Sequence, residues 1–497
     1  MISENRFLLA LVNFMKIALI NPPSLYVYGK ISAGNYCSFP LGLGYIASYL
    51  RQAGHEVRLF DPEPSGMPLK IMFQQLDEFC PDVVGITSVT SNFMLARQIG
   101  MDVKQQLGCR VIMGGPHVNA LPRSTLLGTP SIDAVIMGEG EIPMLALANG
   151  FDARGDVDFA KIPGAAFIEG GQYRENPRPE LIADLDALPY PARDLVDINL
   201  YQLNPHFQRG KKSATILSSR GCPSQCTFCA NLCLGRKFRA HSPEYFVTEM
   251  EFLVKTYGIR HFHIVDDCFT ANSLRVSKIC DLLLAKRLKV SWFIFGRVNT
   301  LRDEGLIRKM KLAGCVYVLL GIETGDQRIS DLMKKGTTLE MAEQCCRLLR
   351  KHRIRYFNSF IIGNEGDTEE TVIATVAFAR KLKSAMAGFN MLIPFPGTAI
   401  FHKYFKDYDT PATNWDHWCS VGPDLPYEPR QTVLSKNDIL RLTAWAYRRY
   451  YCDFSQLLRI LVFVRNPSVL IAYIKAAGSL LRQMRIWSLK SRQTRIQ

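Results

Sequence analysis

The chain contains two stretches in which short apolar runs alternate with amphipathic segments. In the first stretch the runs have the length and β-branched content of buried strands, and they lie at 16–20, 56–60, 82–87, 110–113 and 133–137. Segments 40–53 and 92–107 carry apolar residues at helical spacing. Because the turn after each strand is rich in Gly, Pro, Ser or Asn, the pattern predicts a doubly wound parallel sheet whose turns form a ligand crevice.

The second stretch repeats this alternation. Its predicted strands are 214–218, 261–265, 291–295, 317–320, 356–362 and 388–393. Helical segments fall between them, for example 243–257. Six such units predict an incomplete (β/α)6 barrel, with its chemistry at the carboxyl ends of the strands.

A chain of 497 residues is too long for one ordinary core, so we expect several domains. The predicted units are an α/β domain over 15–151, a turn-rich connector over 152–205, the partial barrel over 206–400 and a helical region over 401–497. Met15 directly precedes the first strand, and we interpret residues 1–14 as an extension from an upstream start, without the features of a signal peptide.

Composition narrows the class of protein. Hydrophobic residues make up 47% and charged residues 21%, which is typical of a folded protein. The net charge of +15 raises the question of nucleic-acid binding, but no motif supports it and we exclude it. The 14 cysteines form no secreted disulfide pattern, so we expect a cytoplasmic protein.

Much of the positive charge lies after Arg430. No apolar run there reaches the length that a membrane-spanning helix needs, because charged residues interrupt segment 457–481. We interpret that segment as two amphipathic helices, which either pack on the body of the protein or lie on a membrane surface, and we favour packing.

The most informative segment carries Cys222, Cys226 and Cys229 directly after a predicted strand. Three thiolates at Cys-x3-Cys-x2-Cys spacing on a compact loop can bind three irons of a [4Fe–4S] cluster. The fourth iron then has no protein ligand and is free to bind S-adenosylmethionine (SAM). The alternative is a zinc site with Cys233 as the fourth ligand, which we disfavour because zinc sites usually show paired Cys-x2-Cys spacing.

The three-cysteine segment resembles the signature of the radical SAM superfamily. In that family the aromatic at the position of Phe228 packs near the adenine of SAM, and the resemblance implies the same here. The strand-end residues Asp266, Asp267 and Arg297 fall where the family contacts SAM. Glu323, in the turn Gly321-Ile322-Glu323, resembles the family residue that binds the SAM ribose or amino group.

The first α/β unit resembles the Rossmann-like cobalamin-binding domain that precedes the barrel in one class of radical SAM enzymes. The resemblance implies cobalamin contacts from Thr87, Ser88, Gly114, Gly115, His117, Gly138 and Glu139. Small residues at these strand ends let a bulky planar cofactor approach the backbone. The Asp-x-His-x-x-Gly signature of many cobalamin enzymes is absent, so we do not assign His117 as a cobalt ligand.

Three functional hypotheses follow, the first two from the resemblance and the third as a competing interpretation of a different class. The first is an enzyme that uses a 5′-deoxyadenosyl radical and cobalamin to methylate an unactivated carbon of a large apolar substrate, such as a lipid, a tetrapyrrole or a natural product. The second is an oxidative cyclase like the anaerobic Mg-protoporphyrin monomethyl ester cyclase. The third is a cobalamin or iron–sulfur sensor without catalysis, which we disfavour because a sensor needs no SAM contacts.

The expected partners are the substrate and an electron donor such as flavodoxin or ferredoxin, with peripheral membrane contact through the C-terminal region as a further expectation. That region is rich in aromatic residues, among them Trp415, Trp418, Trp445, Tyr447, Tyr450 and Tyr451. They could form a roof over an apolar substrate, but we favour ordinary packing of helices on the barrel.

Overall fold

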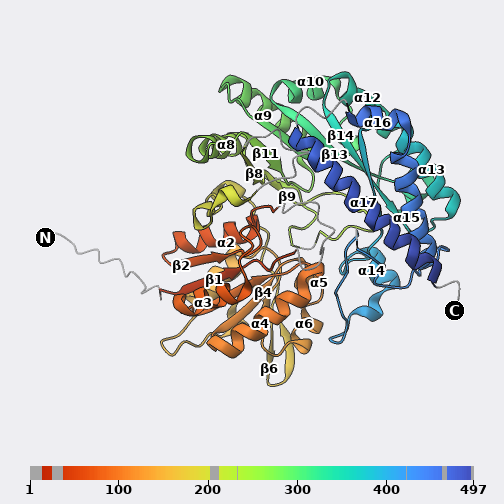
Figure 1. Cartoon of the computed structure of the whole chain (residues 1–497). Coiled ribbons are helices and arrows are strands. Elements are labelled where there is room, and N and C mark those ends of the chain that lie inside the picture. Colours follow the sequence, from red (N-terminus) through yellow and green to blue (C-terminus); the bar gives the residue numbers. More distant parts are fainter. Residues whose placement is uncertain are drawn as a thin grey trace.

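The computed structural model describes residues 14–24, 37–201, 212–231, 233–420, 422–461 and 467–493. The predicted N-terminal extension therefore lies outside the described residues, apart from Phe14. Two α/β units lie against each other, and the C-terminal helices pack along the second unit (Figure 1).

The first unit is built on a seven-stranded sheet with the order β2-β1-β3-β4-β5-β6-β7. Its strands are β1 Lys16–Ile20, β2 Glu56–Phe60, β3 Val83–Thr87, β4 Arg110–Gly114, β5 Ala134–Ile136, β6 Ala165–Glu169 and β7 Gln172–Glu175. The five strands that the sequence predicts are parallel, as expected for a doubly wound sheet.

Strands β6 and β7 lie in the segment that we expected to be only a connector. They form an antiparallel hairpin that extends the sheet. Gly170 and Gly171 join them with φ angles of 56° and 76°, the backbone region that a tight hairpin turn needs and that glycine adopts without strain.

Helices cover both faces of this sheet. They are α2 Leu41–Gln52, α3 Leu69–Phe79, α4 Phe93–Leu107, α5 Pro116–Ala120, α6 Pro122–Gly128 and α7 Glu141–Asn149. Strand β1 shows why two layers form, because its residues alternate between two cores. Ile17 and Leu19 pack with α2 and α7, whereas Ala18 and Ile20 pack with α3 and α4.

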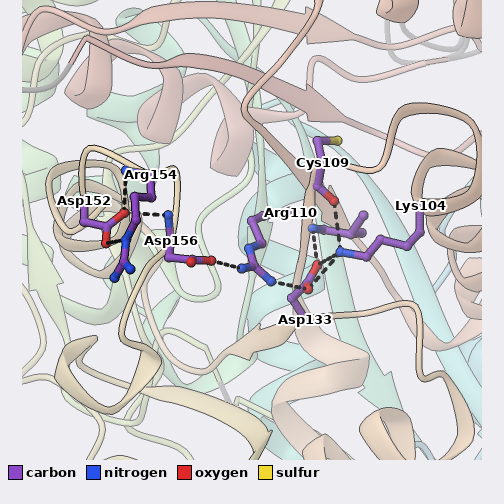
Figure 2. Close-up of polar contacts among 8 residues, drawn as sticks. Lys104, Cys109, Arg110, Asp133, Asp152, Arg154 and Asp156 are labelled. Carbon is purple, nitrogen blue, oxygen red and sulfur yellow. Dashed lines mark hydrogen bonds and ion pairs between the residues drawn. The ribbon is translucent and has the colours of Figure 1, made fainter.

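A polar cluster holds the sheet together at the amino ends of β4 and β5 (Figure 2). Asp133 accepts hydrogen bonds from Lys104 Nζ at 2.7 Å and from the Val111 amide at 2.7 Å. Arg110 bridges Asp133 to Asp156 at 3.2 and 2.6 Å. These charges lie at the edge opposite the carboxyl ends, so they fasten the strands without entering the predicted crevice.

The second unit is a six-stranded, all-parallel sheet with the order β15-β14-β13-β12-β11-β8. Its strands are β8 Ser213–Ile216, β11 His261–Ile264, β12 Ser291–Gly296, β13 Cys315–Glu323, β14 Arg355–Ile362 and β15 Met386–Met391. Between them run α8 Pro243–Tyr257, α9 Ser273–Ala285, α10 Glu304–Leu312, α11 Gln327–Leu332, α12 Leu339–Lys351 and α13 Glu369–Lys381. The prediction of a partial (β/α)6 barrel is confirmed.

Helix α8 illustrates how the sequence sets these elements. The Ser242 side chain accepts a hydrogen bond from the Tyr245 amide at 3.1 Å and caps the first turn, and Pro243 occupies the first helical position. Gly258 ends the helix with a φ angle of 70°. A short pair of strands, β9 Ser219–Arg220 and β10 Arg239–Ala240, lies after β8.

The C-terminal region is helical, as expected. It contains α14 Ala399–Tyr404, α15 Lys436–Tyr451, α16 Phe454–Leu461 and α17 Pro467–Gln493. None of the helices in the described part of the chain is long and apolar enough to cross a bilayer.

Helix α15 covers the free edge of the barrel sheet. The Tyr451 hydroxyl accepts from the Ala387 amide at 3.1 Å and donates to the Ala387 carbonyl at 2.7 Å, while the Tyr447 hydroxyl accepts from the Phe389 amide at 3.1 Å. These contacts satisfy backbone groups that an open edge strand leaves unpaired. Tyr447 and Tyr451 therefore serve the packing of α15 on the barrel, which is the alternative that we favoured over a substrate roof.

Candidate active site

A cavity of about 400 Å³ opens at the carboxyl ends of the first sheet. Five of the residues expected to contact cobalamin line it, namely Thr87, Gly114, Gly115, Gly138 and Glu139. Residues of the barrel unit complete the wall, among them Leu217, Arg220 and Val265. The cavity thus lies between the two units, with the turns of the first sheet on one side and the start of the barrel on the other.

Glycines shape the wall of this cavity. A Cβ atom added at Gly114 or at Gly138 would meet no atom within 4 Å, so a side chain at either position would project into open space. Gly115 is required for a different reason. Its φ angle is 98°, and a Cβ atom there would lie 2.5 Å from the Ser88 carbonyl oxygen.

The structure does not bring Ser88 and His117 to this cavity. Ser88 is fully buried behind Gly115, and its hydroxyl donates to the Gly114 carbonyl at 3.4 Å. The His117 ring stacks on Phe93 at 3.9 Å between ring centroids, and its Nδ1 lies 3.3 Å from the Thr90 hydroxyl. Burial lowers the pKa of His117 to about 3, so the ring is neutral.

Glu139 lines the cavity but is engaged in buried ion pairs with the barrel unit. Its carboxylate accepts from Arg220 Nη1 and from Arg239 Nη1, each at 2.8 Å. Arg220 Nη2 also donates to Glu141 at 2.7 Å. Burial raises the pKa of Glu139, but the bonds from Arg239 and Arg220 more than offset this, and the pKa lies below its ordinary value.

The three-cysteine loop begins immediately after Arg220. Asp266 fixes the segment that precedes this loop. This carboxylate is fully buried and accepts hydrogen bonds from the hydroxyls of Ser218 and Ser219, each at 2.5 Å. Arg275 Nη2 fixes the same segment by donating to the Ser218 carbonyl at 2.7 Å. Asp266, which we expected to contact SAM, therefore has its oxygens occupied by the segment that precedes the cysteines.

Cys222, Cys226 and Cys229 lie together on this loop at the carboxyl end of the barrel. Burial raises the pKa of Cys229 to about 11, and the negative charges of Cys226, Asp267 and Cys222 add to this effect. The thiol of Cys229 is therefore close enough to Cys222 and Cys226 to interact with them electrostatically. Arg297 Nη1 donates to the sulfur of Cys226 at 3.4 Å. Within the described segments, no group of three His, Cys, Asp or Glu side chains is already arranged to hold a metal ion. We therefore assign the cluster ligands from the spacing of the three cysteines and from the loop that they share.

Two further cysteines lie near this loop. A hydrogen bond with the Cys268 thiol is the main cause that lowers the pKa of Cys222 to about 5. Cys233 lines the cavity of the first unit, and burial raises its pKa to about 12. That location, on the wall of the cavity of the first unit, disfavours Cys233 as a fourth ligand of a zinc site.

Glu323 and Lys335 form a buried ion pair at the same end of the barrel. Lys335 Nζ lies 2.7 Å from Glu323 Oε1 and 5.6 Å from the centre of the Phe228 ring. The Lys335 carbonyl accepts a hydrogen bond from Arg297. A side chain at Gly321 would overlap the Glu323 carboxylate, which explains the glycine in this turn.

Comparison with known proteins identifies the family. The model of the radical SAM superfamily matches residues 216–379, and that of the B12-binding domain matches residues 31–148. An uncharacterized methyltransferase of Pyrococcus horikoshii is 32% identical over 443 residues, which cover 88% of this chain and 92% of the relative. The chain is a radical SAM enzyme with a B12-binding domain.

Two other relatives of this radical SAM enzyme are informative. The anaerobic magnesium-protoporphyrin IX monomethyl ester cyclase of Rubrivivax gelatinosus is 30% identical over 446 residues, which cover 88% of this chain and 78% of the cyclase. The structure of the radical SAM methyltransferase TsrM from Kitasatospora setae, with cobalamin and a [4Fe–4S] cluster bound, superposes with a TM-score of 0.66 at 21% identity. It covers 79% of this chain and 75% of TsrM, and it supports the fold.

The two domain families confirm the expected cofactors, which are a [4Fe–4S] cluster, SAM and cobalamin, and the prediction of an enzyme rather than a sensor. The described residues fit these groups. Small and apolar residues line the cavity of the B12-binding domain. Thiols beside the Arg297 guanidinium lie at the carboxyl end of the radical SAM domain and suit iron.

Sequence reasoning missed three residues of the radical SAM enzyme's site, namely Arg220, Arg239 and Lys335. Arg220 directly precedes the Gly221-Cys222 pair, and this position next to the motif was a signal that could have been used. Arg239 lies on the two-residue strand β10 and Lys335 lies in a loop. Neither belongs to a recognisable pattern, and only the fold brings them to Glu139 and Glu323.

Proposed function

We propose that this enzyme methylates an unactivated carbon of a large apolar substrate through a 5′-deoxyadenosyl radical. The observation that carries the proposal is the shared wall between the two cofactor sites. Arg220 lines the cavity of the B12-binding domain and lies two residues before Cys222. When bound, the cluster supplies the electron that cleaves SAM, and cobalamin supplies the methyl group.

We propose Cys222, Cys226 and Cys229 as the cluster ligands. Arg297 supports this assignment because its guanidinium donates to Cys226 and stabilises negative charge on the sulfur. Cys268 supports it in the same way, since its hydrogen bond favours the thiolate of Cys222.

For SAM we propose contacts from Phe228, Asp267, Arg297 and Glu323. Asp267, Arg297 and Glu323 lie at the carboxyl ends of neighbouring barrel strands and Phe228 lies in the cysteine loop, which supports a common ligand. Lys335 holds Glu323 and passes over the Phe228 ring, so it would orient both groups. Asp266 positions the loop through Ser218 and Ser219 rather than facing the ligand.

For cobalamin we propose contacts from Thr87, Gly114, Gly115 and Gly138, all of which line the cavity. Gly114 and Gly138 carry no side chain, and the space beside each of them is open, which leaves room for a planar cofactor. His117, Ser88 and Glu139 are left out of this set because their polar atoms are turned to other residues.

The inner face of the barrel supports an apolar substrate. Phe295 is 40% exposed at the end of β12, and Leu319 and Phe357 are partly exposed on the neighbouring strands. Polar groups on this face include the Ser359–Asn390 pair, joined by a hydrogen bond of 3.1 Å. The imidazole of His263 also belongs to this face, where it stacks on Phe293 at 3.9 Å between ring centroids. A mainly aromatic and apolar lining with some polar groups is typical of sites that bind small molecules.

The test is isotopic labelling of the product. The enzyme is reconstituted without oxygen and incubated with reductant, cobalamin, trideuteromethyl-SAM and a lipid and pigment extract. Methylation predicts a product that carries the deuterated methyl group. The Cys226→Ala variant is the control, because it removes one proposed cluster ligand and should form no such product.

The Rubrivivax relative, named as a cyclase, supports oxidative ring closure as the second candidate function. The same experiment distinguishes the two. A cyclase forms a product that has lost hydrogen and gained oxygen without any deuterium, whereas a methyltransferase forms a labelled product.

An acidic flavodoxin or ferredoxin is the proposed electron donor. The net charge of +15 favours association with an acidic protein through long-range electrostatic attraction. Replacing dithionite by chemically reduced flavodoxin should support formation of 5′-deoxyadenosine, and the rate should fall as salt is added.

We also propose peripheral membrane contact through α17. One side of this helix is fixed to the body, where Gln483 and Trp487 both donate to the Gly422 carbonyl at 2.8 and 3.0 Å. Apolar side chains at helical spacing lie exposed elsewhere on it, namely Leu470, Ile471, Ile474 and Leu481. No acidic residue follows Asp453, and such a basic, apolar helix suits an anionic lipid surface.

Sedimentation with vesicles tests this contact. The enzyme should bind vesicles that contain phosphatidylglycerol and should not bind pure phosphatidylcholine. Changing Ile474 to Gln should weaken binding, whereas changing the exposed Leu312 of α10 to Gln should not. Equal recovery in the pellet with and without vesicles would rule the membrane contact out.

A further inference from the structure

Arg220 is the centre of a buried ion-pair network that joins the B12-binding domain to the radical SAM domain. Its guanidinium donates to Glu139 at 2.8 Å and to Glu141 at 2.7 Å. All three side chains are only 4% exposed. Arg239 donates to the second oxygen of Glu139 at 2.8 Å, so two carboxylates and two guanidinium groups compensate each other in the interior.

The network reaches four segments of the chain. Glu139 lies in the turn after β5 and Glu141 begins α7 directly after that turn, while Arg220 and Arg239 lie on the paired strands β9 and β10. The fourth segment is the connector, because the Ile182 amide donates to Glu139 at 2.9 Å and its carbonyl accepts from Arg239 at 2.6 Å. The turn after β5 is therefore fixed to the barrel by the same groups that hold the connector.

Arg220 has little freedom to move independently of the cluster loop. Only Gly221 separates it from Cys222, and Gly221 has a φ angle of 85°. A Cβ atom at Gly221 would overlap the Lys237 carbonyl oxygen, so the backbone is closely packed there. On the other side of Arg220, Ser218 and Ser219 are held by Asp266.

The same turn forms part of the cavity wall. Gly138, Glu139, Gly140 and Glu141 all line the cavity, as does Arg220 itself. A molecule bound in the cavity therefore contacts the groups that fix the start of the cluster loop. Because the guanidinium binds two carboxylates through a planar fork of donors, it holds the turn and the start of the cluster loop in one geometry.

We propose that Arg220 is a positioning residue that couples occupancy of the cobalamin cavity to the cluster loop, so that cobalamin and SAM bind cooperatively. This inference rests on the proposed cofactor sites and not on the identity of the substrate. Binding free energies that are linked in this way are reciprocal, so cobalamin must strengthen SAM binding by the factor by which SAM strengthens cobalamin binding.

The test is a pair of equilibrium titrations on cluster-loaded enzyme without reductant. Hydroxocobalamin affinity is measured by its absorbance with and without saturating SAM, and SAM affinity by equilibrium dialysis with and without cobalamin. In the wild type each ligand should tighten the other by about fivefold or more, which is the usual range of coupling between sites. Arg220→Lys keeps the charge but loses the planar fork that reaches both carboxylates, and its coupling factor should fall to near one.

Arg51→Lys is the matched control. Arg51 also pairs with an acidic residue, Asp194, at 2.7 Å, but this pair is exposed and lies outside the buried network. Its coupling factor should equal that of the wild type. If Arg220→Lys does not fold, Glu141→Gln, which keeps the Glu139–Arg220 pair, is measured instead and should also reduce the factor.

Two results would overturn the inference. One is a wild-type enzyme in which neither cofactor tightens binding of the other, so that the coupling factor is near one. The other is a coupling factor in the Arg220 or Glu141 variant that equals that of the wild type. Neither depends on methylation. If no labelled product forms but the coupling is lost in the variant, the proposed reaction fails and the positioning role stands.

Discussion

Lys335 Nζ lies 2.7 Å from Glu323 Oε1, and both side chains are buried at the carboxyl end of the barrel. Glu323 adopts a φ angle of 71°, which is rare for a residue with a side chain and which turns its carboxylate toward Lys335. Backbone strain of this kind persists only where surrounding contacts hold it, and it gathers at binding sites. The ion pair therefore connects the stability of the fold to the proposed SAM site.

Changing Lys335 to Met should weaken SAM binding and destabilise the protein. The variant leaves the Glu323 carboxylate buried without its partner, which typically costs about 3–5 kcal/mol. Chemical unfolding and equilibrium dialysis of SAM measure the two effects. Lys334→Met is the control, because Lys334 is the exposed neighbour, and it should change neither quantity by more than about 0.5 kcal/mol.

Changing Cys226 to Ser should prevent assembly of the cluster. The visible charge-transfer absorbance and the iron content of the reconstituted protein should both fall to background, since two thiolates cannot hold the cluster in its three-cysteine arrangement. The exposed Cys452 offers a matched Cys→Ser control that should keep full iron content. A Cys226 variant with wild-type absorbance would contradict the ligand assignment.

Changing Gly114 to Leu should block cobalamin. The added side chain meets no protein atom within 4 Å at its Cβ and lies in the cavity, so the fold should survive while the space for the cofactor is lost. We expect the affinity for hydroxocobalamin to fall by at least about tenfold, because overlap with a packed ligand costs more than 1.4 kcal/mol. Gly478→Leu on α17 also meets no atom within 4 Å and should bind cobalamin as the wild type does.

Changing His117 to Gln should make the stability of the apoprotein less dependent on pH. Burial lowers the pKa of His117 from 6.5 to about 3. Between these values the unfolded chain takes up a proton that the folded chain does not, so stability falls as pH decreases, by up to about 1.4 kcal/mol per pH unit. The variant should lose this component in denaturant titrations at pH 7, 6 and 5.

The exposed His417, substituted in the same way, serves as the control and should leave the pH dependence of unfolding unchanged. The His117 variant should also retain its affinity for hydroxocobalamin, because the ring lies against Phe93 and not in the cavity. A loss of cobalamin binding would show that His117 acts on the cofactor after all.

The sequence predicted the parts of the site that depend on local order. The strands that carry Thr87 and Gly114 and the spacing of Cys222, Cys226 and Cys229 follow from periodicity and motif. The hairpin over 165–175 was missed because we interpreted its Gly170-Gly171 turn as part of a connector.

The contacts between the two domains could not be predicted. Arg220 and Glu139 are 81 residues apart, and neither lies in a pattern that names the other as a partner. Asp266 was expected to contact SAM from its position at a strand end, but the structure has it binding Ser218 and Ser219. Such pairings depend on how two finished units pack, which local sequence does not encode.

Formation of 5′-deoxyadenosine by anaerobically reconstituted protein tests the central claim most directly. With SAM and dithionite, the wild type should release 5′-deoxyadenosine, and electron resonance of the reduced cluster should change when SAM is added. Protein with an intact cluster that releases none, and whose spectrum SAM leaves unchanged, would contradict the account that Cys222, Cys226 and Cys229 leave one iron open for SAM.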